Sequence, residues 1–157
     1  IKLLMIGSAG FGGNVVTPYV QEVQKLVEKA GERVKFTGYI ENQKLYRYYQ
    51  SADIQVIPSL WEEAAGLIAI EGMLSGLPLI ITKSGGMIEY APSNVAVWID
   101  RDNIIPNLEA AITQLADDKE KRKEMSELSL ERAKEFPKKK FYEDYIEVFE
   151  YERIGER

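Results

Sequence analysis

The stretch that decides the fold is residues 58–78, PSLWEEAAGLIAIEGMLSGLP. Apolar, β-prone residues precede it, and Pro58 ends their strand because proline cannot donate to a β-ladder. Residues 66–74 are so apolar that they predict a short and largely buried helix. Gly76 and Pro78 then prevent the helix from continuing. The stretch therefore predicts the end of a strand, a turn, a helix and the entry to the next strand.

Two acids, Glu63 and Glu71, interrupt this apolar block. Eight residues of helix rise about 12 Å, close to the span between the ribose and hexose diols of a nucleotide sugar. Carboxylates accept hydrogen bonds from such diols, and free N–H groups at the helix start, at Gly66, Leu67 and Ile68, suit a diphosphate. The alternative is that Glu63 is a solvated first-turn acid and Glu71 pairs with a buried cation.

The rest of the chain alternates predicted strands and helices, which is typical of an α/β, Rossmann-like, doubly wound and mostly parallel sheet. The strands are expected at 2–6, 34–36, 53–57, 79–82 and 94–99, and the helices at 18–29, 42–51, 66–74, 84–90, 107–116, 119–136 and 141–154. The loops at 7–14, 37–40, 58–66 and 83–86 then meet at the carboxyl edge of the sheet, where such sheets bind ligands.

Three further segments carry polar or aromatic residues that need an interpretation. Backbone N–H groups at Ser84 and Gly85 open a short helix and face the same cleft. The acids of Asp100-Arg101-Asp102 are interpreted as turn and N-cap residues rather than a metal motif, because a helix follows them. The tyrosines of helix 42–51 are interpreted as packing residues.

Composition limits the classes of function. The 157 residues suit one domain, 1–157, and the net charge of −5 argues against nucleic acid as a partner. Without histidine or cysteine, the chain cannot form histidine-dependent triads, disulfides or ordinary zinc sites. No metal site is predicted, and any acid–base chemistry falls to carboxylates, tyrosine or lysine. No apolar run is long enough to span a membrane.

Several motifs occur in the order found in one family. Residues 63–71, EAAGLIAIE, look like the E-x7-E signature of retaining GT-B glycosyltransferases of the family 4 type. Residues 73–81, 84–89, 34–39 and 48–54 resemble the neighbouring segments of that family. The resemblance covers roughly residues 2–150, and linked motifs in order are more specific than a lone pattern.

The resemblance implies the donor-binding half of a retaining, cytoplasmic and metal-independent enzyme. That enzyme would move a hexose from a nucleotide-diphosphate sugar, its co-substrate, to a glycan, lipid or other acceptor. Glu63 would hold hexose hydroxyls near the reacting centre, and Glu71 would hold the ribose. Backbone groups of Gly66, Leu67 and Ile68 would carry diphosphate charge. The turn containing Tyr39 and Ile40 would lie beside the base.

The family pattern also implies what this stretch lacks. An earlier strand and helix, bearing an arginine and a lysine, would precede Ile1, and an acceptor domain would be a further partner. We therefore expect the fragment to be inactive alone and to bind its donor weakly, with an open strand edge or self-association. Peripheral membrane association of a full-length protein stays open. The alternatives are a GT-B sugar-nucleotide epimerase or phosphorylase, and a non-catalytic sugar-nucleotide-binding module.

Overall fold

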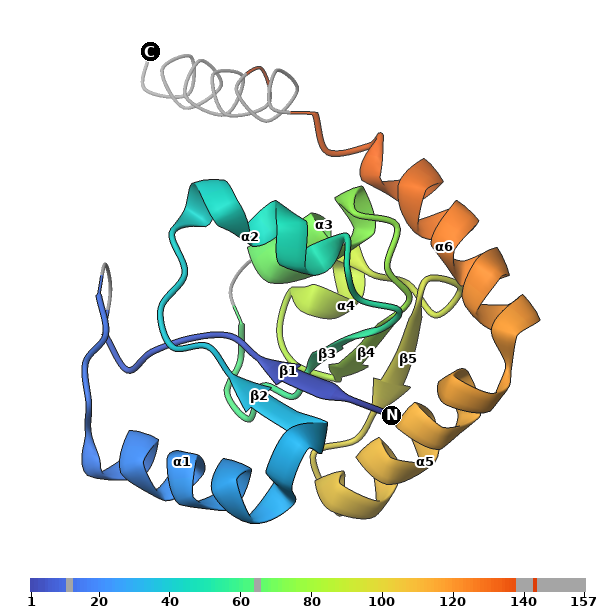
Figure 1. The fold of residues 1–157 in the computed structure, drawn as a ribbon. Coiled ribbons are helices and arrows are strands. Elements are labelled where there is room, and N and C mark those ends of the chain that lie inside the picture. The colour runs from blue at the N-terminus through green and yellow to red at the C-terminus, as the bar shows by residue number, and fades with distance from the viewer. Residues whose placement is uncertain (11–12, 64–65, 138–142, 144–157) are drawn as a thin grey trace. The chain divides into compact units, whose positions relative to one another are not determined.

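A computed structural model describes residues 1–10, 13–63, 66–137 and 143 (Figure 1). The chain divides into two compact units, residues 1–48 and residues 49–157, and each is described by itself. Every pair of neighbouring strands in the described residues is parallel, so the predicted α/β class with parallel pairing is confirmed. The single-domain organisation stays a prediction.

The first unit contains a two-stranded sheet. Strands β1 (Leu3–Met5) and β2 (Val34–Phe36) pair in parallel, with Leu3 opposite Val34. Helix α1 (Pro18–Ala30) connects them and is followed by a 3-10 turn, η1 (Gly31–Arg33). Its two ends carry residue types that favour helix caps: Thr17 accepts from the Val20 N–H at 3.3 Å, and Gly31 ends the helix at φ 65°. Helix α2 (Asn42–Tyr49) leads into the second unit.

The second unit is built on a three-stranded parallel sheet in the order β3 (Gln55–Ile57), β4 (Leu79–Thr82), β5 (Ala96–Ile99). The central strand β4 is completely buried. Its side chains alternate between two clusters, as the period of a strand requires. Leu79 and Ile81 belong to one apolar cluster and Ile80 to the other. Parallel sheets need such cover on both faces.

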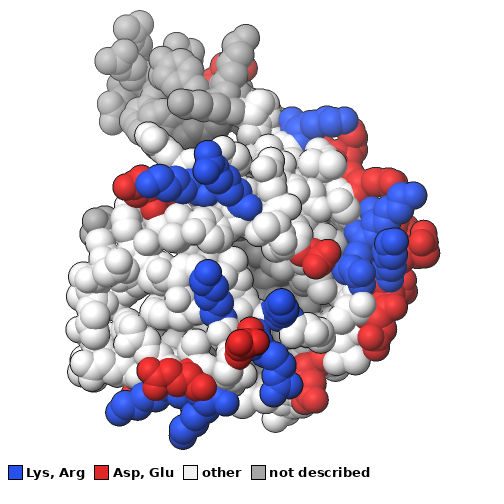
Figure 2. All heavy atoms as spheres, viewed as in Figure 1, with Lys and Arg blue, Asp and Glu red and all other residues white. Residues whose placement is uncertain are grey.

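Helices supply that cover. Residues from α3 (Leu67–Leu74), α4 (Met87–Tyr90) and the end of α6 (Lys119–Ala133) pack in the cluster with Leu79 and Ile81. Residues from α5 (Ile104–Asp117) and Met125 of α6 pack in the cluster with Ile80. Met125, Ser129 and Ala133 are the buried residues of α6 and recur every four positions, so they form one stripe. The remaining surface of α6 carries interspersed acids and bases (Figure 2).

Helix α3 ends as the sequence predicts. The Leu77 N–H donates to the Gly72 carbonyl at 3.0 Å, and the Gly76 N–H donates to the Met73 carbonyl at 2.9 Å. Gly76 adopts φ 71°, so this is a Schellman motif with glycine in the left-handed conformation. The prediction that the helix is largely buried is wrong. Leu67 and Leu74 are exposed, because α3 packs through one face, with Ala69, Gly72 and Met73 buried.

The predicted N-cap of α5 is wrong, and the last predicted helix lies outside the described residues. The acids at 100 and 102 do not cap α5. The N-cap is Asn103, in a left-handed conformation without a side-chain hydrogen bond. Asp100 instead pairs with Lys83 at 2.8 Å, because the two side chains follow adjacent parallel strands. The helix predicted at 141–154 lies outside the described residues, apart from residue 143.

Candidate functional site

Glu63 lies in the loop after β3, and that loop holds its carboxylate. Oε1 of Glu63 accepts hydrogen bonds from the Ser59 hydroxyl at 2.9 Å and the Trp61 indole N–H at 2.8 Å. The side chain is half-buried. It is therefore oriented by neighbours within its own loop, rather than being the freely solvated first-turn acid of the alternative interpretation.

The loop after β4 fixes the backbone of Glu63. The buried Ser84 hydroxyl donates to the Trp61 carbonyl and accepts from the Glu63 N–H at 3.3 Å. The Glu63 carbonyl accepts from the Gly86 N–H at 2.8 Å. Gly85 adopts φ +46°, and a Cβ there would lie 2.2 Å from the Glu63 carbonyl oxygen. Only glycine allows the two loops to approach so closely.

The exposed residue Glu62 also links the loop after β3 to the loop after β4. Its carboxylate accepts from the Gly85 N–H and forms an ion pair with Arg101. The Arg101 guanidinium also donates to the Leu60 carbonyl at 3.3 Å. The Gly85 N–H, followed by Arg101, holds the pKa of the Glu62 carboxyl below its ordinary value. The Gly85 N–H that the sequence assigned to a ligand is thus bonded to Glu62.

Helix α3 begins at Gly66 without a side-chain cap. Gly66 adopts φ +51°, and a Cβ there would lie 2.4 Å from Cγ of Met87, so α4 packs directly against this N-terminus. The N–H groups of Leu67 and Ile68 belong to the first turn, where an α-helix provides no internal acceptor. Both side chains are exposed. The α3 N-terminus therefore presents backbone donors where the sequence predicted a diphosphate.

Glu71 follows one turn later on α3 and is half-buried. Its Oε2 accepts a hydrogen bond from the Tyr49 hydroxyl at 2.8 Å. Among the described residues, no lysine or arginine forms an ion pair with Glu71, so the alternative of a buried cation partner is not seen there. The Gln55 side chain of β3 donates to the Ile68 carbonyl at 3.1 Å and holds the first turn of the same helix.

Tyr39 and Ile40 lie in the first unit, in the turn after β2. The Tyr39 N–H donates to Oδ1 of Asn14 at 2.7 Å. A Cβ at Gly38 would lie 2.4 Å from that same oxygen, so the Asn14 amide sits directly on the turn. Gly7 reinforces the contact, since its N–H donates to the Gly38 carbonyl at 3.1 Å. The predicted base-binding turn is a fixed structure within its unit.

The second unit thus brings together seven of the nine predicted residues. Loop contacts join Glu63, Ser84 and Gly85, and the first two turns of α3 carry Gly66, Leu67, Ile68 and Glu71. Sequence reasoning missed Tyr49, Trp61, Glu62 and Arg101. Two local signals were present: the acidic pair Glu62-Glu63, and Trp61 two positions before Glu63. The contacts of Tyr49 with Glu71 and of Arg101 with Glu62 join residues distant in sequence. In the described part of the chain, no group of three acids could hold a metal ion.

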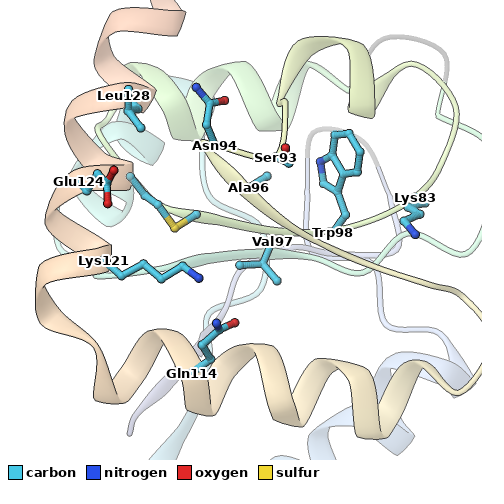
Figure 3. A pocket seen from close by; sticks show the side chains of 11 residues that line it. Lys83, Ser93, Asn94, Ala96, Val97, Trp98, Gln114, Lys121, Glu124 and Leu128 are labelled. Carbon is cyan, nitrogen blue, oxygen red and sulfur yellow. The ribbon is translucent and has the colours of Figure 1, made fainter.

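A separate hollow of about 510 Å³ lies along the edge strand β5 (Figure 3). Its lining comes from β5, α5, α6 and the preceding loop, and includes Trp98, Gln114 and Lys121. None of the nine predicted site residues lines it. Lys83, which directly follows β4, also lines the hollow. The predicted site lies on the loops and the helix start and is separate from this hollow.

Comparison with known families identifies the class of protein. Residues 1–132 match the family described as glycosyl transferases group 1, and the chain belongs to that family. The arrangement matches the C-terminal part of GT-B glycosyltransferase structures. None of the described helices is long and apolar enough to cross a membrane.

Among curated relatives, spore coat protein SA of Bacillus subtilis (strain 168) is 28% identical over 155 residues, covering 98% of this chain and 41% of that protein. D-inositol 3-phosphate glycosyltransferase of Corynebacterium diphtheriae is 28% identical over 137 residues, covering 87% of this chain and 31% of that enzyme. The chain thus spans less than half the length of these relatives.

Among solved structures, sucrose-phosphate synthase from Thermosynechococcus elongatus superposes with a TM-score of 0.79 at 25% identity, covering 96% of this chain and 39% of that one. Anabaena HepE, solved in complex with UDP and glucose, superposes with a TM-score of 0.81 at 21% identity, covering 95% and 40%. The second likeness concerns the fold alone.

Proposed function

We propose that this chain is the donor-binding part of a retaining glycosyltransferase that moves a hexose from a nucleotide-diphosphate sugar to an acceptor. The observation that carries the proposal is the surroundings of the two carboxylates. Glu63 and Glu71 flank the uncapped start of α3, and each accepts hydrogen bonds within the second unit that orient its carboxylate. Acceptors placed on either side of free backbone donors match two sugar rings on either side of a diphosphate.

Each residue then has a role in the proposal. Glu71 accepts from ribose hydroxyls, and Glu63 accepts from the hexose beside the reacting centre. N–H groups of Gly66, Leu67 and Ile68 stabilise diphosphate charge, which grows as the nucleotide leaves. The prediction that Tyr39 and Ile40 lie beside the base concerns the first unit by itself, where Asn14 holds that turn.

The contacts of Ser84 and Gly85 give these two residues a different role in the proposal. Their polar groups already bond to the loop that carries Glu63. A ligand bound to the Gly85 N–H would have to displace the Glu62 carboxylate. We therefore assign Ser84 and Gly85 to holding the Glu63 loop in place.

A titration tests the proposal. UDP-, GDP- and ADP-glucose are added to the labelled chain, and binding is followed by NMR shifts, which detect weak association. We expect one nucleotide series to bind, and Glu71→Gln to weaken it about 10- to 100-fold, because a hydrogen bond to a charged group is lost. Glu109→Gln, on the exposed side of α5, is the matched control and should leave binding unchanged.

The outcomes separate the candidate functions. Unchanged binding in Glu71→Gln would remove Glu71 from the site. A chain that binds none of the three nucleotide sugars would contradict the donor-binding role. Binding of a nucleotide sugar without transfer by a full-length protein would favour the non-catalytic sugar-nucleotide-binding module. The proposal that the enzyme is retaining is tested on a full-length protein, by the anomeric configuration of the transfer product. A product with inverted configuration would contradict it.

A further inference from the structure

The two acids of the proposed donor site share a feature that their spacing did not predict. Within residues 1–10, 13–63, 66–137 and 143, the hydrogen bonds to the Glu71 side chain end on Oε2 alone, and those to Glu63 end on Oε1 alone. In both cases an aromatic residue is a donor: Tyr49 for Glu71 and Trp61 for Glu63. One oxygen of each carboxylate is thus engaged by the protein.

Tyr49 is placed to hold Glu71 firmly. Its ring is half-buried and packs against the apolar cluster that contains Met73 of α3. Its hydroxyl can donate only while it is protonated, and burial, followed by the bond to Glu71, raises its pKa. Tyr49 is therefore a donor across the neutral range. Its ring is fixed by packing and its hydroxyl by one carboxylate oxygen.

Trp61 holds Glu63 in another way. Its side chain is 68% exposed, so the indole contributes little to the core. Its N–H nevertheless lies 2.8 Å from Oε1 of Glu63, the same oxygen that Ser59 reaches. The backbone carbonyl of Trp61 is in turn bonded to the buried Ser84 hydroxyl. Both the indole and the backbone of Trp61 are therefore hydrogen-bonded, although the side chain is not held by packing in the core.

We propose that Tyr49 and Trp61 are positioning residues of the donor site, each engaging one carboxylate oxygen so that the other is left for the nucleotide sugar. This inference rests on the proposed function, because it takes Glu71 as the ribose acceptor and Glu63 as the hexose acceptor. It gives the two aromatic residues separable effects. Tyr49 acts on the nucleoside half of the donor, and Trp61 acts on the sugar half.

The test measures binding of UDP and of UDP-glucose to the chain and its variants. Tyr49→Phe keeps the ring but loses one hydrogen bond, so it should weaken both probes equally, by about 3- to 10-fold. Trp61→Phe should weaken UDP-glucose by a similar factor and leave UDP unchanged. Tyr90→Phe and Trp98→Phe are the matched controls. The indole of Trp98 donates to the Ala91 carbonyl instead of to an acid, so its loss should affect stability and neither affinity.

A double-mutant cycle shows whether Tyr49 acts through Glu71. In a Glu71→Ala background, Tyr49→Phe should weaken UDP binding no further, since the acceptor is gone. Additive losses would overturn the assignment, as would equal losses for UDP and UDP-glucose in Trp61→Phe. Normal binding by both aromatic variants, together with a loss in Glu71→Gln, would overturn this inference and leave the proposed function standing. A wild-type chain that binds neither probe would overturn both.

Discussion

Strands β1 and β4 look alike in sequence and differ in the structure. Both are short, apolar and parallel to their neighbours, as the runs KLLMI at 2–6 and LPLIIT at 77–82 suggest. In the second unit, Leu79, Ile80 and Ile81 of β4 are completely buried. In the first unit, Leu3 and Leu4 of β1 are 47% and 37% exposed.

The difference follows from what covers each sheet. Strand β4 has a strand on each side and apolar clusters on both faces. Strand β1 pairs only with β2 in the described residues, and Val20 is the one buried residue described in the first unit. Burial of apolar area is the main source of stability, so the second unit should carry most of it. An apolar run thus predicts a strand but not its burial.

The largest expected difference between the two units comes from removing one apolar side chain from each of them. Ile81→Ala leaves a cavity in a completely buried strand and should cost about 2–5 kcal/mol of unfolding free energy. Leu26→Ala, in α1, removes a side chain that is already 64% exposed and should cost about 0.5 kcal/mol or less. Urea denaturation of the two variants measures both. Equal losses of unfolding free energy would mean that apolar burial stabilises the first unit as much as the second.

A smaller effect is expected from adding a single methyl group to a glycine. A Cβ at Gly72 would lie 1.7 Å from Oε1 of Gln55 and 2.9 Å from Cδ2 of Leu79, so α3 could not keep its place on the sheet. Gly72→Ala should cost about 1–3 kcal/mol through overpacking. Gly13→Ala, in the first unit, meets nothing within 4 Å and is the matched control. Thermal unfolding compares them, and a neutral Gly72→Ala would contradict the packing of α3.

The smallest effect is expected from the exposed Glu62 carboxylate, which accepts a hydrogen bond from the Gly85 N–H and pairs with Arg101. Because the folded state lowers the pKa of Glu62, its contribution to stability is present above the ordinary value of 4.5 and is lost as pH falls below it. The melting temperature of Glu62→Gln should therefore lie slightly below that of the wild type at pH 7. The gap should close as the pH is lowered through this range. A gap that stays constant with pH would show that the carboxylate bond is not its source.

The site follows a similar division between local pattern and tertiary contact. The distance of eight positions between Glu63 and Glu71, and the glycine that opens α3 between them, could be read directly from the sequence. The partner of Glu71 could not. Tyr49 belongs to a run of tyrosines that predicts packing, yet its hydroxyl reaches an acid 22 positions later. Glu62 lies beside Glu63 in the sequence, but its carboxylate bonds to the Gly85 N–H and so links the loop after β4 to the loop after β3.

The sequence by itself determined the order of strands and helices, the cap at Thr17 and the stop at Gly76, since these depend on interactions within a few residues. It also determined the family, through motifs in a fixed order. The tertiary structure alone decided which apolar strands are buried, which side chain holds the Glu71 carboxylate and how the loop after β4 fixes the backbone of Glu63. All three depend on contacts between segments far apart in the chain, and no local pattern encodes them.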